Sequence, residues 1–288
     1  MKTTISVEPR REVQSLISNV AFANVPSWYG ATRRDLRMDV LAPKVRENAA
    51  PRPAIVWLCG GAYMVVDRSV WVPEMLYFAR RGFVVASVEY RTSNEAQFPA
   101  QLIDVKSAIR YLKAHCREYC VDPDRIFVMG ESAGGSLASL AAVTGAHLEF
   151  DQGDHLDVDS RVRGAVSFYG PSALTDAQMD TGSNPDVPDW TFAAWLGAPL
   201  TPEKLASASA TTYLDENTPP FLLLHGTADT TVPIAMSDRF YEALRARGVP
   251  ADYLVLEGAG HGDARFFQDE VKEKILAFLR GVCAKESD

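Results

Sequence analysis

The stretch Gly130-Glu131-Ser132-Ala133-Gly134-Gly135 decides the fold of this chain. A short apolar run over residues 126–129 precedes it, and an apolar helical pattern over residues 137–143 follows it. A strand, a tight Gly-x-Ser-x-Gly turn and a helix, in that order, form the arrangement called a nucleophile elbow. Small flanking residues permit the sharp turn, and the N–H groups at the start of the helix point toward the serine. The pattern therefore predicts that Ser132 is an exposed nucleophile at the end of a strand.

A Gly-x-Ser-x-Gly string on its own also fits a serine that merely caps a helix. A catalytic serine needs an acid and then a histidine further along the chain. Of the five histidines, His261 lies far enough downstream, in a glycine-rich loop after the alternating run 253–256. Asp229 stands in the loop after the preceding, strongly apolar strand. Ser132, Asp229 and His261 are therefore the predicted catalytic triad.

The rest of the chain alternates between apolar runs and helical patterns, which favours a doubly wound, mostly parallel α/β sheet. Continuous apolar runs predict buried parallel strands over residues 54–59, 83–88 and 162–169. Apolar residues at helical spacing predict helices over residues 73–81, 100–117, 235–247 and 266–282. Residues 37–41, with 20–25 as a further candidate, indicate an antiparallel entry to the sheet.

Composition agrees with a single domain over residues 1–288. The chain has 288 residues, of which 47% are hydrophobic, enough for one large core. Its 29 basic and 37 acidic residues give a net charge of −8, which argues against a nucleic-acid partner. No apolar run is long enough to span a bilayer, and the first residues show no signal peptide, so we expect no membrane partner and a cytoplasmic location.

Neither a metal nor a cofactor is expected. Cys116 and Cys120 are neighbours on one helix face without further ligands, so free thiols are the preferred interpretation of the four cysteines. Four aspartates crowd residues 150–161, but their spacing is not that of an EF-hand, and a solvated loop is preferred.

Residues 171–219 interrupt the alternation with prolines, polar turns and an apolar cluster. Long insertions in compact domains usually form lids or binding loops, so we expect a small cap over the active site. The alternative is a packed surface segment that never contacts substrate. The predicted substrate-binding residues are aromatic: Tyr63 in a glycine-rich loop after the first parallel strand, and the cap residues Trp190, Phe192 and Trp195.

From about Ala54 to the C-terminus the chain resembles α/β-hydrolase esterases of the hormone-sensitive-lipase-like group. The resemblance is strongest to small bifunctional feruloyl/acetyl-xylan esterases. Six strings carry it in unbroken order: Arg81-Gly82-Phe83-Val84-Val85-Ala86-Ser87-Val88-Glu89-Tyr90-Arg91, Asp122-Pro123-Asp124-Arg125-Ile126, the elbow itself, Phe168-Tyr169-Gly170-Pro171, Pro219-Pro220-Phe221-Leu222-Leu223-Leu224-His225-Gly226-Thr227-Ala228-Asp229 and Gly258-Ala259-Gly260-His261-Gly262.

This resemblance implies that the backbone amides of Gly61, Ala62 and Ala133 form the oxyanion hole. It also implies a structural role for His225, which precedes the acid. The chain departs from the family pattern at Cys59-Gly60-Gly61-Ala62, where relatives have His-Gly-Gly-Gly. The lost histidine normally helps to hold the loop, so the rigidity of the oxyanion loop is open at this point.

These observations predict a serine carboxylic-ester hydrolase that acts on small acyl or aromatic-acyl esters, with sugar-linked esters among the candidates. An amidase-type relative, such as an arylformamidase or an acyl-peptide hydrolase, would use the same triad. A non-catalytic binding protein would have no need for all three triad groups. The expected partner is a small-molecule ester, and a homodimer is left open.

Overall fold

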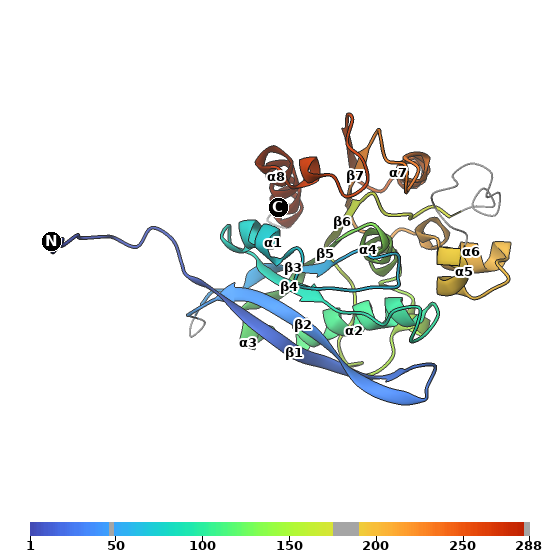
Figure 1. Cartoon of the computed structure of the whole chain (residues 1–288), viewed down its shortest axis with the longest axis horizontal. Helices are drawn as coiled ribbons and strands as arrows, with labels where there is room; N and C mark the ends of the chain where they lie inside the picture. The colour runs from blue at the N-terminus through green and yellow to red at the C-terminus, as the bar shows by residue number, and fades with distance from the viewer. Residues whose placement is uncertain (46–48, 175–189, 285–288) are drawn as a thin grey trace.

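A computed structural model describes residues 1–45, 49–174 and 190–284 of the chain, although not the side chain of Trp190. Its centre is a sheet that contains eight strands within the described residues, in the order β1-β2-β4-β3-β5-β6-β7-β8 (Figure 1). The strands are β1 (Gln14–Ser27), β2 (Thr32–Pro43), β3 (Arg52–Leu58), β4 (Val84–Val88), β5 (Val121–Glu131), β6 (Gly164–Phe168), β7 (Phe221–Gly226) and β8 (Ala251–Leu256).

Six neighbouring strands, β4-β3-β5-β6-β7-β8, are parallel to one another. β1 and β2 form an antiparallel hairpin, and β2 pairs antiparallel with β4 at one side of these six strands. The predicted antiparallel entry is therefore confirmed, and both of its strands are longer than the sequence pattern indicated. Side chains of β3 alternate between two cores: Val56 and Leu58 face one, whereas Ile55 and Trp57 face the other. Burial on both faces explains why the parallel strands appear as unbroken apolar runs.

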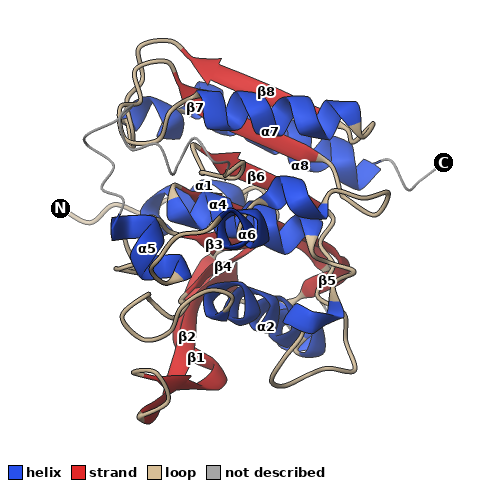
Figure 2. Ribbon diagram, turned by 90° about the vertical axis from the view of Figure 1, so that its right-hand side faces the viewer, coloured by secondary structure: helices blue, strands red, loops and turns tan. Residues whose placement is uncertain are grey.

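Helices cover both faces of the sheet (Figure 2). Residues of α2 (Ala100–Ala114), α4 (Ala133–Val143) and α7 (Ala235–Ala246) belong to one core, and residues of α1 (Val72–Ala79) and α8 (Asp269–Ala284) belong to the other. The other α-helices in the described part of the chain are α3 (Cys116–Tyr119), α5 (Trp190–Leu196) and α6 (Pro202–Ser207). The doubly wound architecture that the sequence predicts is confirmed.

Two of the predicted helices differ from the structure by more than a shift of one or two residues at an end. The helix expected over residues 100–117 is interrupted at His115, which caps α2 and precedes the short α3. The helix expected over residues 266–282 begins at Asp269, because residues Ala264–Phe267 form a separate 3₁₀ turn that Asp263 caps.

The order of the strands determines where a site can form. After β3 the chain passes to β4 on one side, and it then returns to β5 on the other side. Such a change of direction leaves a crevice between the carboxyl ends of the two diverging strands. The loop after β3 and the elbow after β5 both lie at this crevice.

Candidate active site

Ser132 occupies the sharp turn between β5 and α4. Its φ of 53° and ψ of −123° lie in a region that residues with a side chain rarely adopt. Glycine is required on both sides of the turn: a Cβ on Gly130 would lie 2.5 Å from the carbonyl oxygen of Gly134, and a Cβ on Gly134 would lie 2.1 Å from that of Leu58. The glycines of the motif therefore permit the close approach of backbone segments that exposes the serine.

The three predicted triad residues lie together. His261 Nε2 is 2.9 Å from Ser132 Oγ, and His261 Nδ1 is 2.8 Å from Asp229 Oδ2. The imidazole therefore accepts the hydroxyl proton with one nitrogen and donates to the carboxylate with the other. The Asp229 side chain is fully buried, whereas that of His261 is 20% exposed. This is the geometry by which a base activates a serine.

Further hydrogen bonds fix the acid. Asp229 Oδ1 accepts the N–H groups of Thr231 at 2.9 Å and Val232 at 2.8 Å. Burial alone would raise the pKa of Asp229, but hydrogen bonds from His225, His261 and the Val232 N–H outweigh it and hold the pKa well below its usual range. The carboxylate is therefore ionised at neutral pH and can stabilise a protonated His261.

His225 is buried directly behind this acid. Its Nε2 donates to the carbonyl oxygen of Val232 at 2.9 Å and lies 3.3 Å from Asp229 Oδ2. Its Nδ1 accepts the hydroxyl of Ser237 at 2.7 Å. These contacts agree with the structural role that the family resemblance implies, but the sequence did not reveal that the ring touches the acid.

The loop after β3 has an unusual backbone. Gly61, Ala62 and Tyr63 have φ values of 130°, 52° and 59°. A Cβ on Gly61 would lie 2.1 Å from the carbonyl oxygen of Val65, so glycine is required there, whereas Ala62 adopts the left-handed region in spite of its side chain. Within the described part of the chain, the amides of Gly61, Ala62 and Ala133 donate no backbone hydrogen bond, so they remain available as donors. Their role as the oxyanion hole stays a prediction.

Several contacts hold this loop in the absence of the family histidine. Cys59 Sγ donates to the carbonyl oxygen of Asp67 at 3.2 Å, and Tyr90 Oη donates to that of Cys59 at 2.7 Å. Burial, with the nearby charge of Glu131, raises the pKa of the Cys59 thiol to about 12. A thiol that stays protonated is a poor nucleophile, so Cys59 is a structural residue.

Glu131, the variable residue of the elbow motif, makes contacts at the site that the sequence did not predict. Its carboxylate accepts the Gly60 N–H and, at 3.3 Å, the indole N–H of Trp71. Burial raises the pKa of Glu131, and the hydrogen bonds from Gly60 and Trp71, with the nearby charge of His261, only partly oppose this effect. Glu131, which directly precedes Ser132, thus ties the loop after β3 to the elbow.

The predicted substrate-binding aromatics are packed closely. The rings of Tyr63 and Trp195 stack with centroids 3.8 Å apart and planes within 6°, and both are buried. Phe192 is buried beside them. Trp195 also donates its indole N–H to Gln101 at 3.2 Å. Trp195 thus packs on Tyr63 of the loop after β3, and the contact of these rings with substrate stays a prediction.

Part of the expected cap lies outside the described residues, namely 175–189 and the side chain of Trp190. In the part that is described, α5 brings Trp195 against Tyr63, and the carbonyl oxygen of Trp195 accepts the N–H of Phe98. The segment therefore packs on the loop after β3, while its role as a lid stays a prediction.

No group of three metal-ligating side chains is found among the residues that the structure describes. The four cysteines are thiols that form no disulfide within the described residues. The acidic loop at residues 150–161 is only partly solvated, because Asp151 pairs with the buried Arg110 at 2.7 Å and Asp159 pairs with Lys113 at 2.7 Å. Among the described helices, none is long and apolar enough to cross a membrane.

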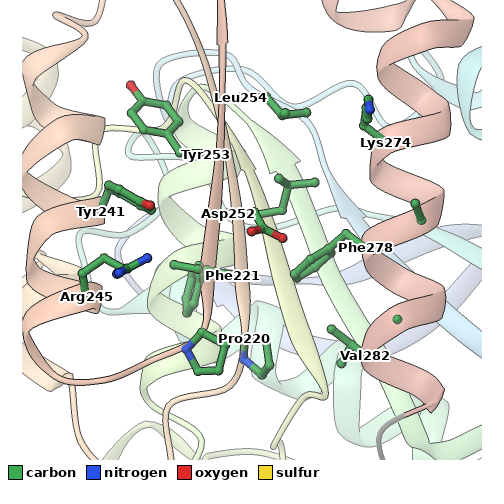
Figure 3. Close-up of a pocket in the computed structure, with 15 residues that line it drawn as sticks. Pro220, Phe221, Tyr241, Arg245, Asp252, Tyr253, Leu254, Lys274, Phe278 and Val282 are labelled. Carbon is green, nitrogen blue, oxygen red and sulfur yellow. The ribbon is translucent and has the colours of Figure 1, made fainter.

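A cavity of about 810 Å³ lies away from the triad, between α7 and α8 on the edge strand β8. Figure 3 shows Tyr241 and Tyr253 on one side of this strand and Lys274 and Phe278 on the other. Pro220 and the start of β7 line it, whereas the triad follows the carboxyl ends of the strands. This cavity therefore lies apart from the three predicted triad residues.

Comparison with known proteins identifies the family and several esterase relatives. The BD-FAE family model matches residues 38–244. The probable carboxylic ester hydrolase LipM of Mycobacterium tuberculosis is 32% identical over 220 residues, which cover 75% of this chain and 50% of LipM. The chain thus spans about half the length of the curated relatives it matches first.

Two solved structures are similar over nearly their whole length. A truncated carbohydrate esterase from gut microbiota has a TM-score of 0.79 at 26% identity and covers 95% of this chain and 98% of its own. The propionate-bound Est2 esterase of the planctomycete Thermogutta terrifontis has a TM-score of 0.70 at 26% identity and covers 92% and 95%. The α/β-hydrolase fold expected from the sequence is therefore confirmed.

Proposed function

The chain belongs to the BD-FAE family of α/β-hydrolase esterases, and from this premise we propose that it is a serine carboxylic-ester hydrolase for small acyl or aromatic-acyl esters. The observation that carries the proposal is the pair of contacts that links Ser132, His261 and Asp229, at 2.9 and 2.8 Å. Each residue follows a different strand, and folding for its own sake does not require the three to meet.

The proposed reaction proceeds through an acyl-enzyme. Ser132 attacks the ester carbonyl while His261 takes its proton, and Asp229 stabilises the imidazolium. The amides of Gly61, Ala62 and Ala133 hold the oxyanion. His261 then protonates the leaving alcohol, and water repeats the sequence on the acyl-enzyme. The chain supplies every group that these steps use.

The acyl group is proposed to be short or flat. Tyr63 directly follows the predicted oxyanion donor Ala62 and stacks on Trp195, and rigid rings beside an acyl site exclude long flexible chains. The relative with bound propionate and the carbohydrate esterase relative support short acyl groups on a sugar alcohol. We therefore propose acetyl to butyryl and hydroxycinnamoyl esters, with carbohydrate-linked esters included.

The test compares nitrophenyl esters from acetyl to decanoyl with formyl and peptidyl anilides. We expect the short esters to be the best substrates and Ser132→Ala to lose essentially all turnover while its melting temperature stays close to that of the parent. A phosphonate inhibitor should add its mass to the peptide that carries Ser132. Ser69→Ala, an exposed serine outside the triad, is the matched control and should react like the parent. Preference for the anilides would instead favour an amidase, and light scattering on the same samples would give the oligomeric state.

A further inference from the structure

The turn that joins β1 and β2 has a backbone that its residues do not favour. The N–H of Gly30 donates to the carbonyl oxygen of Ser27 at 3.1 Å, and the two central residues, Trp28 and Tyr29, have φ values of 50° and 54°. Positive φ at both central positions defines a type I′ turn, for which Asn-Gly is the preferred pair. Two bulky aromatic residues strain such a turn. An Asn-Gly pair would form the same turn without this backbone strain, so the presence of Trp28 and Tyr29 indicates another role for their side chains.

The two rings are largely in solvent. Trp28 is 63% exposed and Tyr29 is 65% exposed, so neither ring adds much to the core. Tyr29 is nevertheless held at both ends, because its N–H donates to the carbonyl oxygen of Glu95 at 2.7 Å and its hydroxyl donates to that of Ser93 at 2.8 Å. A ring fixed in place with an exposed face is a preformed binding surface, since little conformational entropy is lost on binding.

The rings border a hollow of about 520 Å³ that has a mixed lining. Its polar wall is the turn at residues 92–95 with Gln97, and Ala194 of α5 contributes a small apolar contact. Asn94 and Gln97 are exposed and can both donate and accept hydrogen bonds. The charge of Glu95 is already paired with Arg34 and is further satisfied by Ser27 and Thr92. The hollow therefore combines flat apolar faces with neutral polar groups and holds no unpaired charge.

This hollow lies at the catalytic edge of the sheet. β2 runs antiparallel to β4, with Met38 opposite Val88, so the start of β2 extends past the carboxyl end of β4. In both general views the hairpin turn lies on the same side of the molecule as α5 (Figures 1 and 2). The wall is also shared with the oxyanion loop, because Ser93 donates its N–H and its hydroxyl to the carbonyl oxygen of Tyr63, at 2.8 and 3.2 Å.

We infer that Trp28 and Tyr29 form a subsite for a pyranose ring in the alcohol part of the ester, with Asn94 and Gln97 binding its hydroxyl groups. A pyranose presents a face of C–H groups that packs on an aromatic ring, and its equatorial hydroxyls project toward polar neighbours at the edge. This combination matches the composition of the hollow, whereas a fatty alcohol would leave the polar wall unpaired. The inference rests on the proposed esterase function and assigns the carbohydrate to a place on the molecule.

The test uses binding and turnover together. In a Ser132→Ala background, unesterified xylotetraose should bind in a titration calorimeter, and Trp28→Ala or Tyr29→Ala should weaken binding about tenfold or more, the order expected for loss of an aromatic contact. In the active enzyme, the same substitutions should lower the ratio of kcat/KM for acetylated xylotetraose to that for nitrophenyl acetate by a similar factor, mainly through KM. Acetylated cellotetraose is a second sugar substrate for the same comparison.

A double variant separates binding from folding. Trp28→Asn with Tyr29→Gly places the preferred pair in the type I′ turn, so its melting temperature should match or exceed that of the parent while sugar binding is lost. Leu156→Ala, an exposed apolar side chain elsewhere, is the matched control and should bind as the parent does.

Two outcomes would overturn the inference. In one, the parent hydrolyses nitrophenyl acetate but the variants leave the specificity ratio and the sugar affinity unchanged. In the other, the substitutions change the oligomeric state and leave the sugar affinity unchanged, which would identify the turn as a contact between two copies of the chain. Absence of any turnover by the parent would instead refute the proposed function.

Discussion

Removal of the Glu131 carboxylate should disable the predicted oxyanion loop while the three side chains of the proposed triad stay in place. Glu131 accepts the N–H of Gly60, and the indole of Trp71 donates to the same oxygen. We therefore expect Glu131→Ala to free the loop from the elbow, whereas Glu131→Gln keeps an oxygen acceptor at the same place and loses only the charge. The two substitutions should form a graded series.

The size of each effect follows from these contacts. A hydrogen bond to a charged group contributes about 1.5–3 kcal/mol and a neutral one about 1 kcal/mol, so Glu131→Gln should lose about 0.5–2 kcal/mol. That difference corresponds to roughly two- to thirtyfold in rate. Glu131→Ala leaves the Gly60 N–H without its acceptor and lets the loop move, and loss of one oxyanion donor reduces kcat about 10²–10³-fold.

The assay is steady-state hydrolysis of nitrophenyl acetate together with thermal melting. Because an oxyanion hole acts in the transition state, kcat should fall while KM changes by less than about threefold. Gly60→Ala perturbs the same contact from the other side, since its Cβ would lie 2.6 Å from Glu131 Oε1; because that Cβ would also lie 2.8 Å from Ser132 Cβ, its kcat defect should be at least as large as that of Glu131→Ala. Glu118→Gln, on an exposed carboxylate, is the control.

Protonation of Glu131 should have the same consequence. Burial raises the pKa of Glu131, so the carboxylate form is lost at a higher pH than for an ordinary glutamate as the solution is acidified. As the pH falls, the kcat of the parent should therefore approach that of Glu131→Gln, and the ratio of the two kcat values should decrease. A folded Glu131→Ala enzyme that keeps a third or more of the parent kcat would refute this account of the loop.

Three further predictions concern Asp229, Trp195 and Glu95, which pairs with Arg34 of the β1–β2 hairpin. Asp229→Asn should keep the site assembled but lower kcat on the order of 10⁴-fold, because His261 loses its tautomer preference; a loss below about tenfold in the same ester assay would point to another acid, with Glu257 the first to test. Trp195→Ala should lower the free energy of unfolding by about 3–5 kcal/mol in urea titrations, because the ring is fully buried; a change in acyl-chain preference would add a pocket role, and an unchanged preference would leave a packing role alone. Although burial opposes ionisation of Glu95, hydrogen bonds from Arg34 and from neighbouring residues hold the pKa of Glu95 at about 2. The contribution of Glu95 to the free energy of unfolding is therefore present above the unfolded-state pKa and is lost as pH falls toward 2. Glu95→Gln should be less stable than the parent at pH 7, and a difference in stability that stays constant down to pH 2 would contradict this prediction.

The sequence by itself predicted the sheet, the elbow and the three residues that we propose as the triad. These features depend on local physics: unbroken apolar runs indicate strands buried on both faces, and glycines beside Ser132 indicate a turn that tolerates no side chain. The chain order of serine, acid and histidine then predicted residues that the structure brings within hydrogen-bond distance. Helix ends were less accurate, because the break at His115 and the turn before Asp269 depend on capping and packing.

Only the tertiary structure decided how the site is supported. Glu131 and Gly60 are 71 residues apart, and the carboxylate reaches the oxyanion loop because β3 and β5 are neighbours in the sheet. The stacking of Tyr63 on Trp195 and the exposed position of Trp28 at a strained turn likewise have no local signal. Side-chain periodicity records whether a residue is buried, but not which distant residue it meets, and the order of the strands supplies that information.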